Sequence, residues 1–436
     1  MTWNAKLLFL ILFTTAVSYA SGILIEMKPK RKILWMVISV LASLSILFFF
    51  KYYNFVVGSI GNLFDTDLTL SLILPVGISF YTFQTLSYSI DVYRGAIKAE
   101  HNFFYYALFV SFFPQLVAGP IERPDNLLPQ LHAEHKFNTD DLHIGAKRML
   151  AGFFKKIVVA DTAAVYVNAV YNNPSESKGL AIIIATLLFA VQIYCDFSGY
   201  TDIAIGCARI MGYRLMQNFN RPYSAENIRD FWSRWHISLS SWFKDYLYIP
   251  LGGNRKGYKR QLLNLFIVFI VSGLWHGAEW TFILWGLIHG IYRIIGEFTY
   301  KKREKIYTNA GIDTSTCTFR SIRIVITFIL VCFAWIFFRA NNISELILIL
   351  KNLFTTVGFS TFASELGITL SNALIMIFSI IIMILLDRKL TLARYDSPSG
   401  AKLFGGTSLY LLWAIIFAWL LLLASDGSSA FIYFQF

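Results

Sequence analysis

The chain carries little charge for its length. Of its 436 residues only 15% are charged, whereas 56% are hydrophobic and 17% are aromatic. A soluble domain carries about 25% charged residues, so this composition argues against a soluble protein. Apolar runs of about twenty residues recur along the whole chain, and each is long enough to cross a bilayer as a helix. The sequence therefore predicts an all-α polytopic membrane protein.

Cysteine is scarce, and its positions carry no pattern. The four cysteines lie far apart in the sequence, at Cys195, Cys207, Cys317 and Cys332. This spacing indicates neither a disulfide framework nor a zinc site. Apolar burial also keeps a cysteine thiol unreactive, which disfavours a thiol acyl intermediate. We expect no bound metal and no cysteine nucleophile.

Acidic residues are outnumbered by basic ones. The chain has 26 Asp and Glu against 38 Lys and Arg, which gives a formal net charge of +12. The basic residues cluster in short loops at 28–32, 301–305 and 388–402. Such clusters are typical of cytoplasmic loops that face anionic lipid, so we predict contact with membrane lipid and no nucleic-acid partner.

The apolar runs predict ten spans, and no repeat or linker divides the chain, so we predict one domain over 1–436. The first run resembles a signal peptide, but we expect an uncleaved span because many more follow. Residues 120–178 leave three alternatives open: interfacial helices, one more span, or a re-entrant pair. The predicted spans are 5–25, 33–53, 68–90, 103–119, 179–197, 260–277, 279–299, 321–339, 369–387 and 404–424.

An amphipathic segment lies between Pro222 and Pro250. Within it, "FWSRWHISLSSWFKDYLYIPLGGNR" starts at Phe231, and large apolar side chains recur every three or four residues. Charged side chains fall on the opposite face, which predicts one helix that lies at the membrane interface or dips into protein, rather than one that spans lipid. His236 falls at the edge of the apolar stripe. It is either an interfacial histidine with a hydrogen-bond partner or a functional residue.

A second histidine lies inside a long apolar stretch. "SGLWHGAEW" (272–280) interrupts about thirty residues that are too long for one upright span. Two glycines flank His276 and weaken the helix there, so we predict two helices with His276 at the break. An ionisable residue at membrane depth is typical of a functional site. His289 also lies between two glycines, but their spacing suits close helix packing, so we expect it to be structural.

Two carboxylates accompany another apolar run. "QIYCDFSGYTDIAIG" (192–206) contains Asp196 and Asp202. Carboxylates at membrane depth are costly and usually face a cavity or a partner. We expect the two residues to hold a polar network rather than to perform the chemistry.

Together these motifs carry a family resemblance. The two histidine stretches, "FFPQLVAGPIERP" (112–124), "QIYCDFSGYTDIAIG" and the terminal "FIYFQF" resemble the membrane-bound O-acyltransferase superfamily, in its alginate O-acetyltransferase-like branch. The resemblance runs across most of the chain. The related D-alanyl transfer proteins share the Trp-His stretch but differ around the later histidine. Glu279 departs from the pattern, because an uncharged residue is expected there.

The resemblance implies a bundle of about 10–12 transmembrane helices, with re-entrant and interfacial helices around a central tunnel. It places His276 at the active-site position and His236 at the second family histidine. It implies an O-acetyltransferase of the bacterial cell membrane that moves an acetyl group from cytoplasmic acetyl-CoA to an extracytoplasmic hydroxyl. The implied partners are an SGNH-hydrolase-like acetyl acceptor outside the cytoplasm and a surface polysaccharide as the final acceptor.

Residues for the chemistry and for donor binding follow from this expectation. A desolvated His276 would be a neutral imidazole able to take the hydroxyl proton, while His236 would orient the thioester carbonyl or stabilise the oxyanion. A basic run could meet the phosphates of acetyl-CoA, although positive-inside charge and helix pairing explain any single arginine better. The substrate- or donor-binding candidates are Arg221, Arg229, Arg234, Asp196, Asp202 and Trp275, and the basic run also includes Arg209 and Arg214.

Other functions stay open at this point. One is D-alanyl transfer to teichoic acid from a carrier-protein thioester. Another is a polysaccharide-precursor transporter, because broken helices and buried polar residues also mark transporters, although no inverted repeat is visible. A third is an inactive scaffold, in which replacing either histidine would leave polymer acetylation intact.

Overall fold

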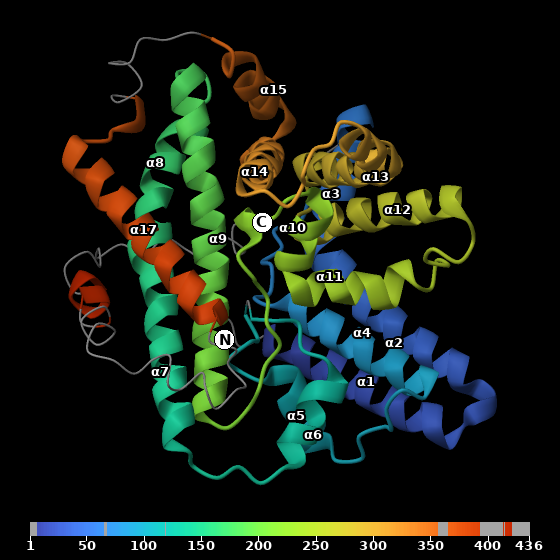
Figure 1. The fold of residues 1–436 in the computed structure, drawn as a ribbon. Coiled ribbons are helices and arrows are strands. Elements are labelled where there is room, and N and C mark those ends of the chain that lie inside the picture. The colour runs from blue at the N-terminus through green and yellow to red at the C-terminus, as the bar shows by residue number, and fades with distance from the viewer. Residues whose placement is uncertain are drawn as a thin grey trace. The chain divides into compact units, whose positions relative to one another are not determined.

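The computed structural model describes residues 7–64, 68–117, 119–355, 365–392, 413 and 415–420. Within these ranges every regular element is helical and no strand occurs, which confirms the all-α prediction (Figure 1). The chain forms two compact units, Met1–Ala146 with Ala204–Met216, and Lys147–Ile203 with Gln217–Phe436. Two of the three boundaries, 146/147 and 203/204, fall inside helices, and the third, 216/217, falls in an irregular segment. A single domain over 1–436 stays a prediction.

The first unit contains a group of packed helices drawn in blue in Figure 1. Close approach between them is possible because Gly22 on α1 has no side chain and lies directly against the ring of Tyr88 on α4. Tyr88 and Tyr106 are fully buried, with ring centroids 4.3 Å apart, at the centre of this unit. Its elements are α1 (Leu8–Met27), η2 (Pro29–Arg31), α2 (Lys32–Leu47), η3 (Phe48–Tyr52), α3 (Tyr53–Phe64), α4 (Ile78–Arg94), α5 (Phe103–Ser111), α6 (Pro124–His132) and the start of α7 (Thr139–Phe153).

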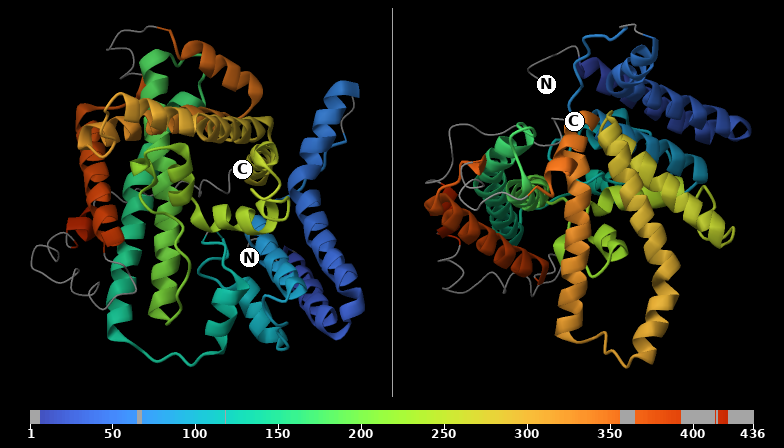
Figure 2. Two further views of the ribbon diagram at one scale, coloured as in Figure 1. Left: turned by 45° about the vertical axis from the view of Figure 1, so that its right-hand side comes forward. Right: turned by 90° about the horizontal axis from the view of Figure 1, so that it is seen from above.

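The second unit contains both histidine stretches. In Figure 2 its helices α13 and α14 run as two long neighbours joined by one turn. After the end of α7, its elements are η4 (Phe154–Ala160), α8 (Asp161–Tyr171), most of α9 (Gly179–Ile210), η5 (Pro222–Ser224), α10 (Ile228–Arg234), α11 (Ile237–Phe243), η6 (Lys244–Tyr248), α12 (Tyr258–His276), α13 (Trp280–Asn309), α14 (Cys317–Arg339), α15 (Ile343–Asn352) and α17 (Leu370–Leu392).

Five helical stretches in the described ranges are long and apolar enough to cross a membrane. These five agree with five of the ten predicted spans. They are Leu8–Met27, Pro29–Gly61, Gly179–Ile210, Cys317–Arg339 and Leu370–Arg388. Helices α12 and α13 also occupy the predicted spans 260–277 and 279–299, without meeting the same criterion. A polytopic membrane protein is therefore confirmed, whereas a total of 10–12 spans stays a prediction.

Two predicted spans differ from the structure. The span at 103–119 is wrong, because α5 has only 9 residues and ends at Ser111, where the backbone of Phe112 leaves the helical region. Nine residues cover less than half of the hydrocarbon core. The predicted span 68–90 begins too early, because the helix found there, α4, starts only at Ile78. Most of 404–424 and the terminal "FIYFQF" lie outside the described residues.

The open segment 120–178 folds as a series of helices, namely α6, α7, η4 and α8. None of them belongs to the five membrane-crossing stretches. The helix η4 has π geometry, and it carries Lys155 and Lys156 toward acidic residues of the second unit.

Candidate active site

His276 is the last residue of α12, where the chain turns toward α13. Gly277 adopts an extended backbone, and α13 starts at Trp280. This confirms the predicted break. The glycines on either side of it let two backbones meet: a Cβ at Gly273 would overlap the carbonyl oxygen of Phe282. The short turn therefore holds His276 at a helix end, with 3% of its surface exposed.

His236 also lies at a break, which the sequence did not predict. The single helix expected between Pro222 and Pro250 is wrong, because α10 ends at Arg234 and α11 starts at Ile237. Between them His236 has φ +44°, a left-handed conformation that costs energy for any residue except glycine. Strained backbone of this kind is concentrated at functional sites. The N-cap of α10 is Asn227, whose side chain accepts from the backbone N–H of Asp230.

The two breaks bring the histidines together. Their ring centroids are 6.4 Å apart, which is too far for a direct hydrogen bond and suits one bridging oxygen. Trp275 lies beside both rings, with centroids 5.9 Å from His236 and 5.0 Å from His276. Trp285 and Phe338 pack against His276 at 4.9 and 5.4 Å. The site is therefore a pair of imidazoles enclosed by aromatic rings.

His236 has a polar support on one side. Its Nδ1 lies 3.0 Å from Oδ1 of Asn218, which comes from the segment before η5. His236 lies between two short helices and outside the five membrane-crossing stretches, and desolvation by burial lowers its pKa from the ordinary 6.5 to about 3. This imidazole is therefore neutral over the physiological range.

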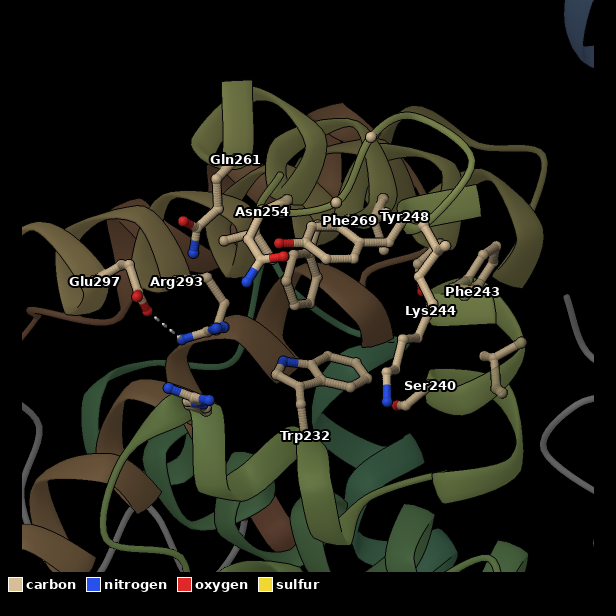
Figure 3. Close-up of a pocket in the computed structure, with 18 of the residues that line it drawn as sticks. Trp232, Ser240, Phe243, Lys244, Tyr248, Asn254, Gln261, Phe269, Arg293 and Glu297 are labelled. Atoms are coloured by element: carbon tan, nitrogen blue, oxygen red, sulfur yellow. Dashed lines mark ion pairs between the residues drawn. The ribbon is translucent and has the colours of Figure 1, made fainter. Parts of the chain in front are cut away.

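A cavity of about 770 Å³ lies in the second unit (Figure 3), and neither histidine is among the residues that line it. Leu239, one turn after His236, and Ser272, one turn before His276, both line it. We call it the basic pocket, because its wall carries four cations and one acid, namely Arg229, Lys244, Arg255, Arg293 and Glu297. In Figure 3, Lys244 and Arg293 reach toward the cavity from either side of Trp232.

Few charges in the basic pocket are paired. Arg293 and Glu297 are 3.8 Å apart, which is long for an ion pair. Trp232 is fixed by a hydrogen bond from its Nε1 to Nδ1 of His289, at 3.2 Å. His289 is fully buried and holds a wall of the pocket, which fits the structural role expected for it. The pocket as a whole offers a cationic, partly aromatic surface.

The two predicted carboxylates lie in ion pairs. Asp202 accepts from Arg148 and Lys155, both at 2.9 Å, and Lys155 also pairs with Asp387. We call these four residues the buried ion-pair cluster; they line a second cavity of about 30 Å³, together with Arg221. Asp196 pairs with Lys156 at 2.8 Å. The carboxylates thus form the expected polar network, away from the basic pocket.

The structure does not gather the predicted basic run into one place. Of the five arginines in that run, only Arg229 lines the basic pocket. Arg234 instead pairs with Asp230 at 2.7 Å, four residues earlier on α10. In the first unit, Arg209 and Arg214 both bind Asp141, at 3.0 and 2.8 Å. The pocket cations Lys244, Arg255 and Arg293 were missed because they come from three separate segments.

No group of three or more His, Cys, Asp or Glu side chains has the arrangement of a metal site within the residues described above.

Comparison with known proteins gives a consistent result. The family described as MBOAT, membrane-bound O-acyltransferase, matches residues 94–344, which is more than half of the chain. The chain is similar to a protein of Pseudomonas aeruginosa named probable alginate O-acetylase AlgI, at 39% identity over 350 residues, 78% of this chain and 65% of that protein. It therefore spans slightly less than two thirds of that relative's length.

Two further relatives extend the comparison. A peptidoglycan O-acetyltransferase of Helicobacter pylori is 36% identical over 388 residues, covering 82% of this chain and 72% of that protein. A teichoic acid D-alanyltransferase of Bacillus subtilis is 30% identical over 285 residues, covering 62% of this chain and 70% of that protein.

Proposed function

The chain belongs to the membrane-bound O-acyltransferase family, and from this premise we propose that it is an O-acetyltransferase. It is a multi-pass protein of the bacterial cell membrane. In the proposed reaction an acetyl group passes from a cytoplasmic thioester to a hydroxyl outside the cytoplasm. The observation that carries the proposal is the pair of buried imidazoles, 6.4 Å apart, with Leu239 and Ser272, one turn from each of them along the chain, in the wall of a basic pocket.

The chemistry requires a proton acceptor. The hydroxyl oxygen attacks the thioester carbonyl, the C–O bond forms, and the C–S bond breaks as the thiolate leaves. We propose that His276 takes the hydroxyl proton and returns it to the thiolate, so no proton is gained or lost overall. An imidazole enclosed by Trp275, Trp285 and Phe338 is suited to this role, since apolar surroundings favour its neutral form.

We propose acetyl-CoA as the donor. Its phosphates are anionic, and four cations with one acid line a cavity large enough for a long, flexible ligand. The thioester end would extend past Ser272 toward His276. The alternative donor is a carrier-protein thioester, which the similarity to the D-alanyltransferase supports. The two are separated by measuring transfer from acetyl-CoA alone in the absence of any carrier protein.

The acceptor is proposed to be a glycan hydroxyl. The names of the similar proteins refer to alginate and to peptidoglycan, so the acceptor class is a surface polysaccharide. The immediate acceptor is proposed to be an SGNH-hydrolase-like partner outside the cytoplasm, which passes the acetyl group onward. Mass spectrometry of the surface glycan, with and without this protein, identifies the polymer.

The test is a single substitution in proteoliposomes. His276→Ala should lower acetyl transfer by about 10²–10⁴-fold, because one general base contributes this much to a rate. The assay measures release of free CoA together with the acetylated acceptor. His143→Ala, which changes an exposed histidine on α7, is the control and should retain the rate.

Two outcomes would contradict the proposal. A purified His276→Ala protein that transfers acetyl at the wild-type rate would remove the base role. Movement of an intact glycan precursor across the bilayer, with no CoA released, would identify a transporter instead.

A further inference from the structure

Asn218 holds the strained turn at His236 from two directions. Its side-chain Oδ1 lies 3.0 Å from His236 Nδ1 and accepts from Ser238 Oγ at 2.9 Å. Its backbone oxygen accepts from Ile237 N at 2.9 Å. Asn218, His236 and Ser238 are almost completely buried. One asparagine therefore binds three consecutive residues where the backbone is left-handed.

The orientation of the Asn218 amide follows from its neighbours. The backbone N–H of Ser238 points at Oδ1 at 3.4 Å, and a backbone N–H can only donate. On the other side Nδ2 donates to Thr201 Oγ1 at 3.4 Å. Turning the amide over would place its NH₂ group against the Ser238 N–H. The oxygen therefore faces the histidine, and His236 Nδ1 must carry a hydrogen.

This arrangement fixes the tautomer of His236. A neutral imidazole carries one hydrogen, and with that hydrogen on Nδ1 the other nitrogen, Nε2, presents a lone pair. Because burial lowers its pKa to about 3, the ring stays neutral when the protein is active. Nε2 can therefore accept a hydrogen bond but cannot donate one.

We propose that Asn218 is a positioning residue that fixes His236 with its Nε2 as a hydrogen-bond acceptor in the acyl-transfer site. This inference rests on the proposed function. It settles the role left open for His236, since an acceptor nitrogen repels a developing oxyanion and attracts the O–H of the incoming hydroxyl. His236 Nε2 can then hold the O–H of the incoming hydroxyl before His276 takes its proton, while the tetrahedral oxygen must point away from His236.

A spectroscopic test does not depend on activity. Solid-state ¹⁵N spectra of histidine-labelled protein in bilayers, compared with the His236→Gln variant, identify the protonated ring nitrogen of His236. We expect the hydrogen on Nδ1 at neutral pH. A hydrogen on Nε2 would overturn the inference, and it would do so whether or not the protein proves to be an acyltransferase.

A kinetic test uses two substitutions. Asn218→Asp keeps the acceptor and adds negative charge beside the ring, which favours imidazolium and raises the pKa of His236. Activity should therefore be lost at a higher pH than in the wild type. Asn218→Leu removes the acceptor, and kcat should fall about 10²-fold with KM changed by less than about threefold.

The matched control removes another asparagine from a polar network of the second unit. Asn168 accepts from Arg339 at 2.8 Å and touches neither histidine, so Asn168→Leu should keep kcat per folded molecule. An unchanged acidic limb in Asn218→Asp would contradict the inference, and so would a wild-type kcat in Asn218→Leu. If Asn218→Leu does not fold, the Asn218→Asp profile and the ¹⁵N spectra still decide it.

Discussion

The buried ion-pair cluster and the basic pocket use the same residue types in opposite ways. In the cluster, each lysine or arginine lies within 2.9 Å of a carboxylate, and the space left is about 30 Å³. In the pocket, four cations face about 770 Å³ with one acid, and the pair within it is 3.8 Å long.

The difference separates structural charges from charges available to a ligand. A buried charge is tolerated only when an opposite charge and hydrogen bonds compensate for its desolvation. The cluster meets this condition through its own residues. The pocket cations face a cavity, so an anionic ligand can supply the compensation. The number of carboxylates within reach, rather than the residue type, therefore indicates the role.

The largest effect should come from breaking the cluster. Lys155→Met leaves Asp202 and Asp387 without the ammonium group between them, and removing one partner of a buried ion pair costs about 3–5 kcal/mol. The free energy of unfolding in detergent micelles measures it. Lys301→Met, at an exposed position on α13, is the control and should change little. If Lys155→Met unfolds with the same free energy as the wild type, the charges of the buried ion-pair cluster are not structural.

The next effect should come from reversing a charge in the pocket. Arg229→Glu should raise KM for acetyl-CoA about 10-fold, which equals about 1.4 kcal/mol, because a phosphate contact is lost and repulsion is added. Stability should be unchanged, in contrast to Lys155→Met. Lys259→Glu changes an exposed residue outside the pocket lining and serves as the control. Equal KM values for the two variants would count against phosphate binding.

Removing the single acid of the pocket should have a smaller effect in the opposite direction. Glu297→Gln should lower KM for acetyl-CoA about two- to threefold, because partly exposed ion pairs contribute about 0.2–1 kcal/mol. The same steady-state assay measures it. A higher KM in this variant would mean that Glu297 binds the donor itself.

The smallest effect concerns paired charges in the first unit. Burial raises the pKa of Asp141, but hydrogen bonds and charge from Arg214 and Arg209 outweigh it and hold the pKa below the ordinary 3.8. The stabilisation that the Asp141 carboxylate gives to the folded state is therefore complete above pH 3.8 and is lost as pH falls through the folded-state pKa. Asp141→Asn should cost less than about 1 kcal/mol at neutral pH, because asparagine keeps the size of the side chain and one accepting oxygen for Arg209, and because Arg214 is half exposed. Unfolding curves measure the effect: at pH 7 the variant should be less stable than the wild type, and below pH 4 the two free energies of unfolding should converge.

The sequence predicts one helix break and misses the other for a physical reason. Around His276 the apolar stretch is too long for one span and glycines interrupt it, so the break is visible locally. Around His236 the apolar period continues through the break. The turn there depends on hydrogen bonds that the oxygens of Asn218, eighteen residues earlier, accept, and periodicity cannot detect such bonds.

The pairing of charges shows the same limit. Arg209 and Arg229 are equivalent in the sequence, yet the first binds Asp141 and the second faces the pocket. Their difference depends on which carboxylates the fold brings near them. The length of α5 was also predicted wrongly, because the sequence of 103–119 stays apolar after the helix has ended at Ser111.

The π geometry of η4 depends on the number of residues in this segment. A π-helix bonds each residue to the fifth along, one more than in an α-helix, and it presents the neighbours Lys155 and Lys156 to different carboxylates. Deleting one residue from Phe154–Ala160 would convert this segment to ordinary α-helix and change which carboxylates Lys155 and Lys156 reach. Natural variants should therefore keep both the length of η4 and its two lysines.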